Sequence, residues 1–173
     1  MILPSSEWLG ERLAQLGIDY ISYEHVPLAN CTVAKEIGLE REGVGLKNLF
    51  LRDNYGKRHF LVITLADKQL DLKALSKQQG VSRLGFCSSE RLEKYLKVKP
   101  GSVSALATLN DEHKQVELWL DGELRQAKQW QCHPFENDKT WVITLEDLKA
   151  FWRNSGHEPS WVTLPERKLS NVK

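Results

Sequence analysis

The sequence predicts an α+β fold with a mixed, mostly antiparallel sheet in a single domain. Its 173 residues are about the length of one domain. Helix-like and strand-like patterns are mixed along the chain. The clearest strand pair, residues 46–52 and 58–65, is separated by the turn-rich stretch 53–57. A connection this short makes an antiparallel hairpin rather than a parallel crossover, which favours α+β over a doubly wound fold.

The individual elements follow from local signals. Apolar residues at helical spacing, with a serine, threonine or glycine at the ends, predict helices over residues 6–16, 32–37, 70–79, 88–97 and 146–154. Alternating apolar residues bounded by turn formers predict strands over residues 20–23, 46–52, 58–65, 83–87, 116–120 and 141–144. From residue 158 onward the chain has two prolines and a polar end, which predicts a loose tail (158–173) after a domain spanning residues 1–157.

Composition excludes several classes of protein. Lys and Arg number 24 and Asp and Glu 23, a net charge of +1, which argues against a DNA-coating protein. No apolar stretch approaches the ~20 residues of a membrane span, and the N-terminal sequence lacks the pattern of a signal peptide. Three widely spaced cysteines are typical of reduced thiols. We therefore expect a cytoplasmic protein that binds neither DNA nor membrane.

Common catalytic motifs are absent from the sequence. Residue types that bind zinc occur without the paired spacing of a zinc site: Cys31, Cys87, Cys132 and His133. There is no phosphate-binding glycine loop and no GxSxG nucleophile motif. Ser102 or Ser104 with His133 would make a serine hydrolase, but no orienting carboxylate can be assigned to them. We expect no metal and no other cofactor.

Lys47 is the first of three local features that can take part in chemistry. It lies in an otherwise apolar strand and shares one face with Leu49 and Leu51. Its stem is therefore expected to cross a partly buried surface. The plain structural alternative is an exposed strand lysine.

The other two features are a loop and a histidine. Loop 100–105 is small and polar, and Gly101 allows a ligand to approach the backbone closely, although a surface turn has the same composition. His133 and Pro134 lie between strand signals, followed by Asn137 and Thr140. A strand-end histidine that bonds a backbone carbonyl is the structural alternative there.

The order of these features resembles the YbaK/ProRS-associated (INS-like) aminoacyl-tRNA editing-domain family. The resemblance extends over about residues 8–152 and rests on Lys47-Asn48-Leu49-Phe50-Leu51, then Gly101 to Ser104, then Cys132-His133-Pro134 with Asn137 and Thr140. The KNLFL stretch and the HPxxNxxT spacing are most similar to the free-standing ProXp-ala (PrdX) branch.

The resemblance implies a fold and an activity. Family members are single domains with a mixed, partly barrel-like sheet surrounded by helices, and they hydrolyse the ester of mischarged tRNA. The ProXp-ala branch removes alanine from alanyl-tRNA(Pro), an error of prolyl-tRNA synthetase, which is thereby a candidate partner. The implied mechanism is substrate-assisted: the ribose hydroxyl beside the ester helps to activate water. No protein nucleophile is then required.

The resemblance also implies roles for particular residues. The catalytic set is Lys47, Gly101 and His133, with Lys47 suited to the terminal phosphate or to the developing charge on the carbonyl. The substrate-binding set is Asn48, Ser102, Val103 and Thr32. Three lysines before the loop are a candidate patch for the acceptor end of tRNA, or simply the solvated end of a helix: Lys94, Lys97 and Lys99.

One departure from the family pattern keeps alternatives open. The family loop has the pattern GxxxP, and this chain has Ala105 at the position of the proline. A proline there would fix the backbone of the loop. The alternatives are the same fold with cysteine or serine specificity, a non-catalytic module that binds tRNA or a synthetase, and an unrelated thiol or serine hydrolase.

Overall fold

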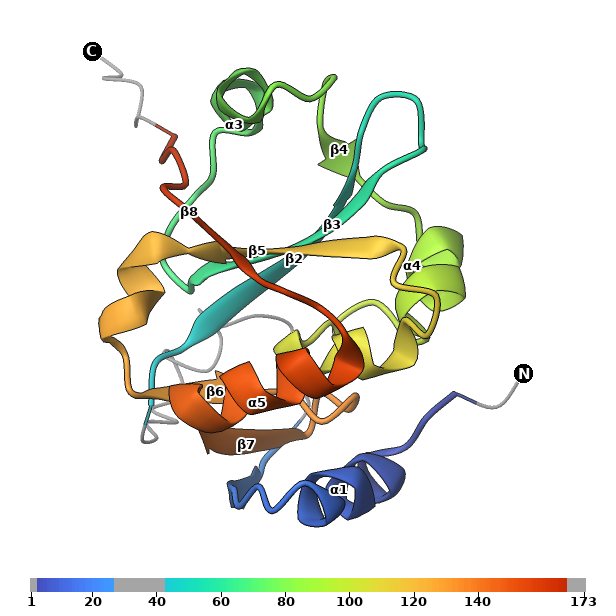
Figure 1. Cartoon of the computed structure of the whole chain (residues 1–173), viewed down its shortest axis with the longest axis vertical. Coiled ribbons are helices and arrows are strands. Elements are labelled where there is room, and N and C mark those ends of the chain that lie inside the picture. The colour runs from blue at the N-terminus through green and yellow to red at the C-terminus, as the bar shows by residue number, and fades with distance from the viewer. Residues whose placement is uncertain (1–2, 27–42, 168–173) are drawn as a thin grey trace.

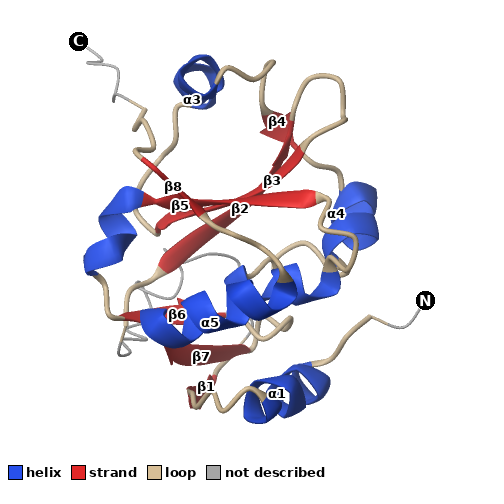
Figure 2. Ribbon diagram, in the orientation of Figure 1, coloured by secondary structure: helices blue, strands red, loops and turns tan. Residues whose placement is uncertain are grey.

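The computed structural model describes residues 3–26 and 43–167 of the chain, and within these ranges the strands form two sheets. The smaller sheet is antiparallel, in the order β1 (Ile21–Glu24), β7 (Lys139–Thr144), β6 (Gln129–Cys132). The larger has the order β4 (Gly85–Phe86), β2 (Leu46–Arg52), β3 (His59–Leu65), β5 (Val116–Asp121), β8 (Ser160–Val162). The helices and strands are seen in Figures 1 and 2.

The larger sheet is mixed. The β2–β3 hairpin is antiparallel, with Leu46 opposite Leu65 and Arg52 opposite His59, whereas β3–β5 and β5–β8 are parallel. The α+β prediction and the predicted hairpin are thus confirmed. The described strands do not close into a barrel; a parallel bridge between Val44 and Trp130 connects the edges of the two sheets.

The helices predicted within the described residues are observed, with ends that differ from the prediction by at most two residues. They are α1 (Ser6–Gln15), α3 (Leu72–Gln79), α4 (Ser89–Leu96) and α5 (Leu145–Ser155), with short 3₁₀ segments η1 (Ala105–Asn110) and η2 (Gly122–Gln126). Each α-helix has an N-cap side chain that accepts a backbone N–H: Ser5, Asp71, Ser88 and Thr144. Gly80 and Gly156 end α3 and α5 in the left-handed conformation.

The larger sheet separates two apolar clusters. The main cluster fills the space between the two sheets and is closed by α1, α4 and α5; Trp130 and Trp152 are fully buried there, with ring centroids 5.6 Å apart. The second cluster packs Leu75 of α3 against Leu51 and Phe60 on the other face. α3 and α5 accordingly lie on opposite sides of this sheet in Figure 1.

The C-terminal segment differs from its prediction as a loose tail. β8 pairs in parallel with β5, and Val162 and Leu164 are buried against the second cluster. A strand of three residues carries too little periodicity to be recognised, and it is stabilised by partners far away in the chain. The four-residue β6 was also not predicted as a separate strand. The helix expected over residues 32–37 lies outside the described residues.

In the part of the chain that the structure describes, none of the helices combines the length and apolarity required to cross a membrane.

Candidate functional site

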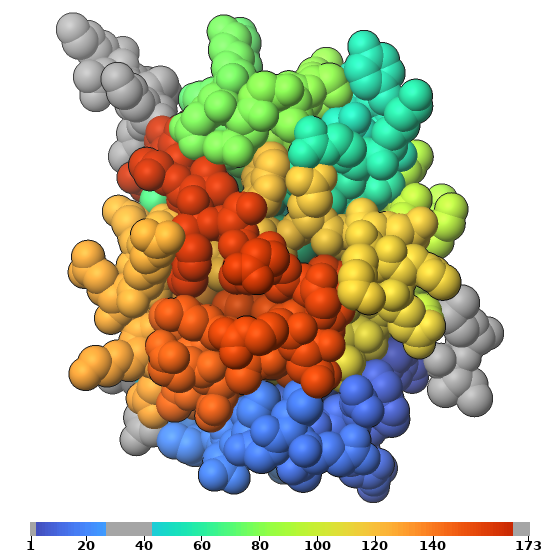
Figure 3. Space-filling model, viewed as in Figure 1, coloured from blue at the N-terminus to red at the C-terminus, as the bar shows by residue number. Residues whose placement is uncertain are grey.

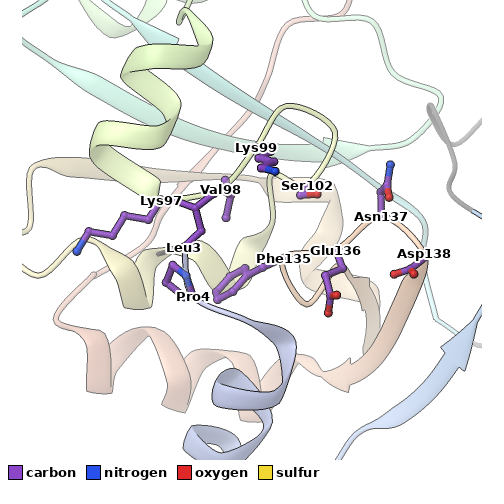
Figure 4. A pocket seen from close by; sticks show the side chains of 10 residues that line it. All are labelled: Leu3, Pro4, Lys97, Val98, Lys99, Ser102, Phe135, Glu136, Asn137 and Asp138. Atoms are coloured by element: carbon purple, nitrogen blue, oxygen red, sulfur yellow. The ribbon is translucent and has the colours of Figure 1, made fainter. Parts of the chain in front are cut away.

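A pocket of about 320 Å³ lies where three segments meet. One is the loop that leaves α4, another is the turn that precedes β7, and the third is the arm before α1. Figure 4 shows the side chains of the loop and of the turn around this hollow, with the arm beside them. The lining residues are Leu3, Pro4, Lys97, Val98, Lys99, Ser102, Phe135, Glu136, Asn137 and Asp138.

Gly101 gives the loop its shape. Its φ of +87° lies in the left-handed region, which favours glycine. The N–H of the next residue, Ser102, donates to the carbonyl of Lys99 at 3.0 Å and closes the turn. Ser102 is buried and lines the pocket, while the partly buried Val103 packs against the main cluster. The backbone N–H of Ser102 therefore has an acceptor within the loop, and Gly101 and Val103 are the remaining candidates for donation to a substrate.

Gly101→Ala is expected to destabilise this loop by about 1–2 kcal/mol, because an L-residue is strained at positive φ. Space is not the cause, since a Cβ there would lie 3.9 Å from the Asn137 Nδ2 atom, an ordinary contact. Denaturant unfolding measures the loss of stability, and a deacylation assay measures the effect on turnover. An alanine variant as stable as the parent would show that the loop relaxes to negative φ.

The turn after His133 forms the opposite wall. His133 Nδ1 donates to the carbonyl of Lys139 at 3.3 Å, so the ring connects the two ends of the turn through a hydrogen bond. Phe135 has a φ of +66°, unusual for an aromatic residue, and is buried. The backbone-bonded histidine considered as a structural alternative is thus observed. A catalytic role for His133 stays a prediction.

Glu136 and Lys139 attach this turn to the start of α1. Lys139 Nζ donates to Ser6 Oγ at 3.2 Å and to Glu136 Oε2 at 3.3 Å. The hydrogen bond with Ser6 is the main cause that lowers the pKa of Glu136, and Lys139 adds to it. The Asp138 Oδ1 atom is buried and has no hydrogen-bond partner within the described ranges. The pocket thus has a carboxylate side chain in one wall and lysines in another.

Lys47 does not line this pocket. Strand alternation puts it on the α3 side of the larger sheet, together with Leu49 and Leu51, as predicted. The side chain is half-buried, and its Nζ donates to the backbone carbonyl of Lys68 at 2.6 Å. The structure brings Gly101, Ser102 and the turn after His133 together, and it places Lys47 at the beginning of β2, outside their pocket.

The beginning of β2 nevertheless runs beside β6. Val44 and Trp130 form a parallel bridge, so the two segments run in the same direction from it. Lys47 lies three residues after Val44, and His133 lies three residues after Trp130. Asn48 is half-buried on the face opposite to Lys47, and its Oδ1 is buried without a partner among the residues that the structure covers. Thr32, the fourth substrate-binding candidate, lies outside the described residues.

Several lining residues were not found from the sequence. Leu3, Pro4 and Glu136 have no local pattern that marks a site. His25 was missed as well: its Nε2 lies 2.9 Å from the Oγ1 of Thr140, in the motif that contains His133. In the sequence, Pro134 was the one residue that indicated an unusual turn at Phe135.

Ala105, which stands at the family proline position, is the first residue of η1. Its carbonyl accepts from the indole N–H of Trp152 at 2.9 Å. The preceding residue, Ser104, is extended, with φ −146° and ψ 152°, and its hydroxyl accepts from the N–H of Leu106. Proline favours this first helical position and requires an extended residue before it. The loop therefore holds a proline-compatible backbone without the proline.

Ala105→Pro is accordingly expected to be tolerated and to raise the free energy of unfolding by about 0.4–1 kcal/mol, by restricting the unfolded chain. The N–H that proline lacks has no acceptor within the helix at this position. Thermal unfolding measures the change, with Ala107→Pro, inside the same 3₁₀ segment, as the control that should destabilise. A large loss of stability in Ala105→Pro would mean that the ring does not fit this buried position.

Among the residues that the structure describes, Cys87, Cys132 and Ser104 are not placed to act as nucleophiles. Burial raises the pKa of Cys87 to about 11 and that of Cys132 to about 12, so both thiols are protonated at neutral pH. Ser104 is buried and caps η1. No cluster of three or more His, Cys, Asp or Glu side chains among the described residues is arranged to hold a metal ion.

Comparison with known proteins decides the family. A family model described as an aminoacyl-tRNA editing domain matches residues 26–151. The chain belongs to this family. The resemblance seen in the KNLFL and HPxxNxxT stretches is thereby confirmed, and the chain is an aminoacyl-tRNA deacylase, a hydrolase of the ester between amino acid and tRNA.

Relatives of this editing domain carry names that refer to proline. The "Prolyl-tRNA editing protein ProX" of Acetoanaerobium sticklandii is 38% identical over 146 residues, 84% of this chain and 89% of the relative. The "Prolyl-tRNA synthetase associated domain-containing protein 1" of Danio rerio is 33% identical over 153 residues, 87% and 83% of the two chains. A crystal structure described as a candidate trans-editing enzyme for prolyl-tRNA synthetase aligns with a TM-score of 0.68 at 18% identity, covering 96% of this chain and all of that one, which shows the shared fold.

Proposed function

We propose that this editing domain acts in trans in the cytoplasm and hydrolyses mischarged tRNA, with alanyl-tRNA(Pro) as its best substrate. The pocket between the Gly101 loop and the turn after His133 is the observation that carries this proposal. At about 320 Å³ it lies at the small end of the range for ligand sites, which suits a small aminoacyl group on a terminal ribose. The prolyl-tRNA names of two relatives support tRNA(Pro) as the carrier.

The charges around the pocket suit the two ends of such a substrate. Lys97 and Lys99 line it and offer cations to the phosphates of the single-stranded acceptor end. Asp138 lines the pocket and offers a carboxylate acceptor for the α-ammonium group that an aminoacyl ester carries. Recognition of the α-ammonium group distinguishes aminoacylated tRNA from free tRNA, because both carry the same phosphates.

The chemistry requires a positioned water and stabilisation of the charge that develops on the ester carbonyl. We assign the stabilisation to the Gly101 loop and to the ammonium of Lys47. Because Lys47 lies outside the pocket, this assignment requires the ester to extend from the pocket toward the beginning of β2. The free ribose hydroxyl next to the ester assists the water. His133 orders the turn, through its hydrogen bond to the carbonyl of Lys139, rather than removing a proton.

A deacylation time course with purified protein tests the proposal. The panel contains tRNA(Pro) charged with alanine, cysteine, serine or proline, together with alanyl-tRNA(Ala) and N-acetyl-alanyl-tRNA(Pro). We expect rapid loss of alanine from tRNA(Pro), sparing of prolyl-tRNA(Pro), and slower loss from the N-acetylated ester, whose amino group is neutral. Faster loss of cysteine or serine than of alanine would assign the specificity to that amino acid instead. Binding without any turnover would favour a non-catalytic module. Co-purification with prolyl-tRNA synthetase would test the candidate partner.

A further inference from the structure

The ammonium of Lys47 is held by a second lysine. Lys47 Nζ donates to the backbone carbonyl of Lys68 at 2.6 Å, across the turn that follows β3. Ala66 N donates to the carbonyl of Gly45 and Lys68 N donates to that of Leu65, which closes this turn beside the beginning of β2. Of the three N–H donors of the Lys47 ammonium, this contact uses one. The direction of the remaining donors therefore depends on where the Lys68 carbonyl lies.

The side chain of Lys68 is anchored in the protein. Its Nζ lies 2.8 Å from Asp121 Oδ2 and 2.9 Å from Glu123 Oε2, with side-chain exposures of 9% for Lys68 and 1% for Asp121. Thr64 Oγ1 donates to the same Asp121 oxygen at 2.6 Å, and Thr64 is the register partner of Lys47 in the hairpin. Burial alone would lower the pKa of Lys68, but its hydrogen bonds with Asp121 and Glu123 outweigh this and raise it.

The C-terminal segment holds the same turn from the other side. The carbonyl of Leu164 lies 3.4 Å from Lys68 Nζ, and that of Pro165 accepts from Asp71 N at 2.9 Å. Arg167 N donates to the carbonyl of Gln69 at 2.7 Å. In Figure 3 this segment, in red, lies against the green atoms of α3. Residues 68–71 are therefore fixed between β5 and the end of the described chain.

We propose that Lys68 is a positioning residue for Lys47: its buried ion pair with Asp121 fixes the turn whose carbonyl aims the Lys47 ammonium. The catalytic consequence of this role rests on the proposed function, because it requires that Lys47 act on the substrate. The placement of the ammonium itself does not depend on that function and can be measured separately.

Lys68→Met removes the anchor. A small activated ester acetylates the Lys47 amine, and peptide mass spectrometry measures the rate of this reaction. We expect the rate to rise about tenfold, the factor that corresponds to the loss of one charge-assisted hydrogen bond. Misplacement of the ammonium is expected to lower kcat/KM for alanyl-tRNA(Pro) by about 10- to 100-fold. The exposed Lys149, paired with Glu146 on α5, gives the matched control variant Lys149→Met, which should change neither readout.

Two further variants keep the test decisive. Lys68→Met/Asp121→Asn leaves no buried charge unpaired, because the remaining partner Glu123 is 62% exposed. The double variant is therefore expected to fold even if the single variant does not, and it should give the same rise in Lys47 labelling. Lys68→Arg restores the cation and should move labelling back toward the parent. Unchanged Lys47 labelling in a folded variant would overturn the proposal, whatever the effect on stability. Faster labelling with unchanged turnover would uphold the positioning role and refute the proposed part of Lys47 in hydrolysis.

Discussion

Replacing Lys47 by alanine is expected to lower kcat/KM for deacylation of alanyl-tRNA(Pro) by about 100-fold or more. The lysine offers a compact cation on a stem that crosses a partly buried surface of the larger sheet, and a carbonyl already holds one of its N–H groups. A cation fixed in this way stabilises developing negative charge without reorganising during the reaction. Single-turnover deacylation with wild type and Lys47→Ala side by side measures the effect.

The matched control is Lys73→Ala, which removes an exposed lysine of α3 on the same side of the sheet. It should retain wild-type rates, and both variants should unfold at the same temperature as the parent within a few degrees. If Lys47→Ala and Lys73→Ala deacylate equally fast, Lys47 has no part in the reaction. A rise in KM with unchanged kcat would instead assign Lys47 to binding of the terminal phosphate.

The second large effect is expected at Asp111, which joins the end of η1 to β5 and α5. Its Oδ1 accepts from Gln115 N at 3.0 Å, and its Oδ2 accepts from Val116 N and from His157 Nε2, each at 2.8 Å. Only 4% of the residue is exposed. Asp111→Asn leaves buried donors unsatisfied and should lower the free energy of unfolding by about 3 kcal/mol, or roughly 6–12 °C in Tm.

This loss should depend on pH. Burial by itself would raise the pKa of Asp111, but the hydrogen bonds from His157, Gln115 and Val116 outweigh it and lower the pKa below the ordinary 3.8. A carboxylate with a lowered folded-state pKa stabilises the fold above the unfolded-state value and loses this contribution as pH falls through the folded-state value. The difference between wild type and Asp111→Asn should therefore be full above about pH 5 and shrink below pH 4.

Urea unfolding from pH 7 down to pH 3 measures this profile. Glu117→Gln provides the control, because Glu117 and Arg58 form an ion pair whose side chains are 42% and 48% exposed. Exposed pairs of this kind contribute about 1 kcal/mol or less. A stability difference for Asp111→Asn that stays constant across the whole pH range would show that shape, rather than charge, accounts for the loss.

The elements predicted correctly are those with local signals. The hairpin of residues 46–52 and 58–65 follows from alternation around a polar turn, and the helix ends follow from capping side chains and glycines. The same alternation determines that Lys47 shares a face with Leu49 and Leu51. The family resemblance also depends on short motifs, so it too could be read from the sequence.

Only the tertiary structure decided how these residues combine. The pocket joins Ser102 to Asn137 and to the arm before α1, Lys47 is held by the carbonyl of Lys68, and the expected tail contributes β8 to the sheet. In each case the partners are far apart in the chain. A local pattern of residues specifies a helix or a strand, but the partner of a side chain depends on how those elements pack against one another, and that is set by the whole core.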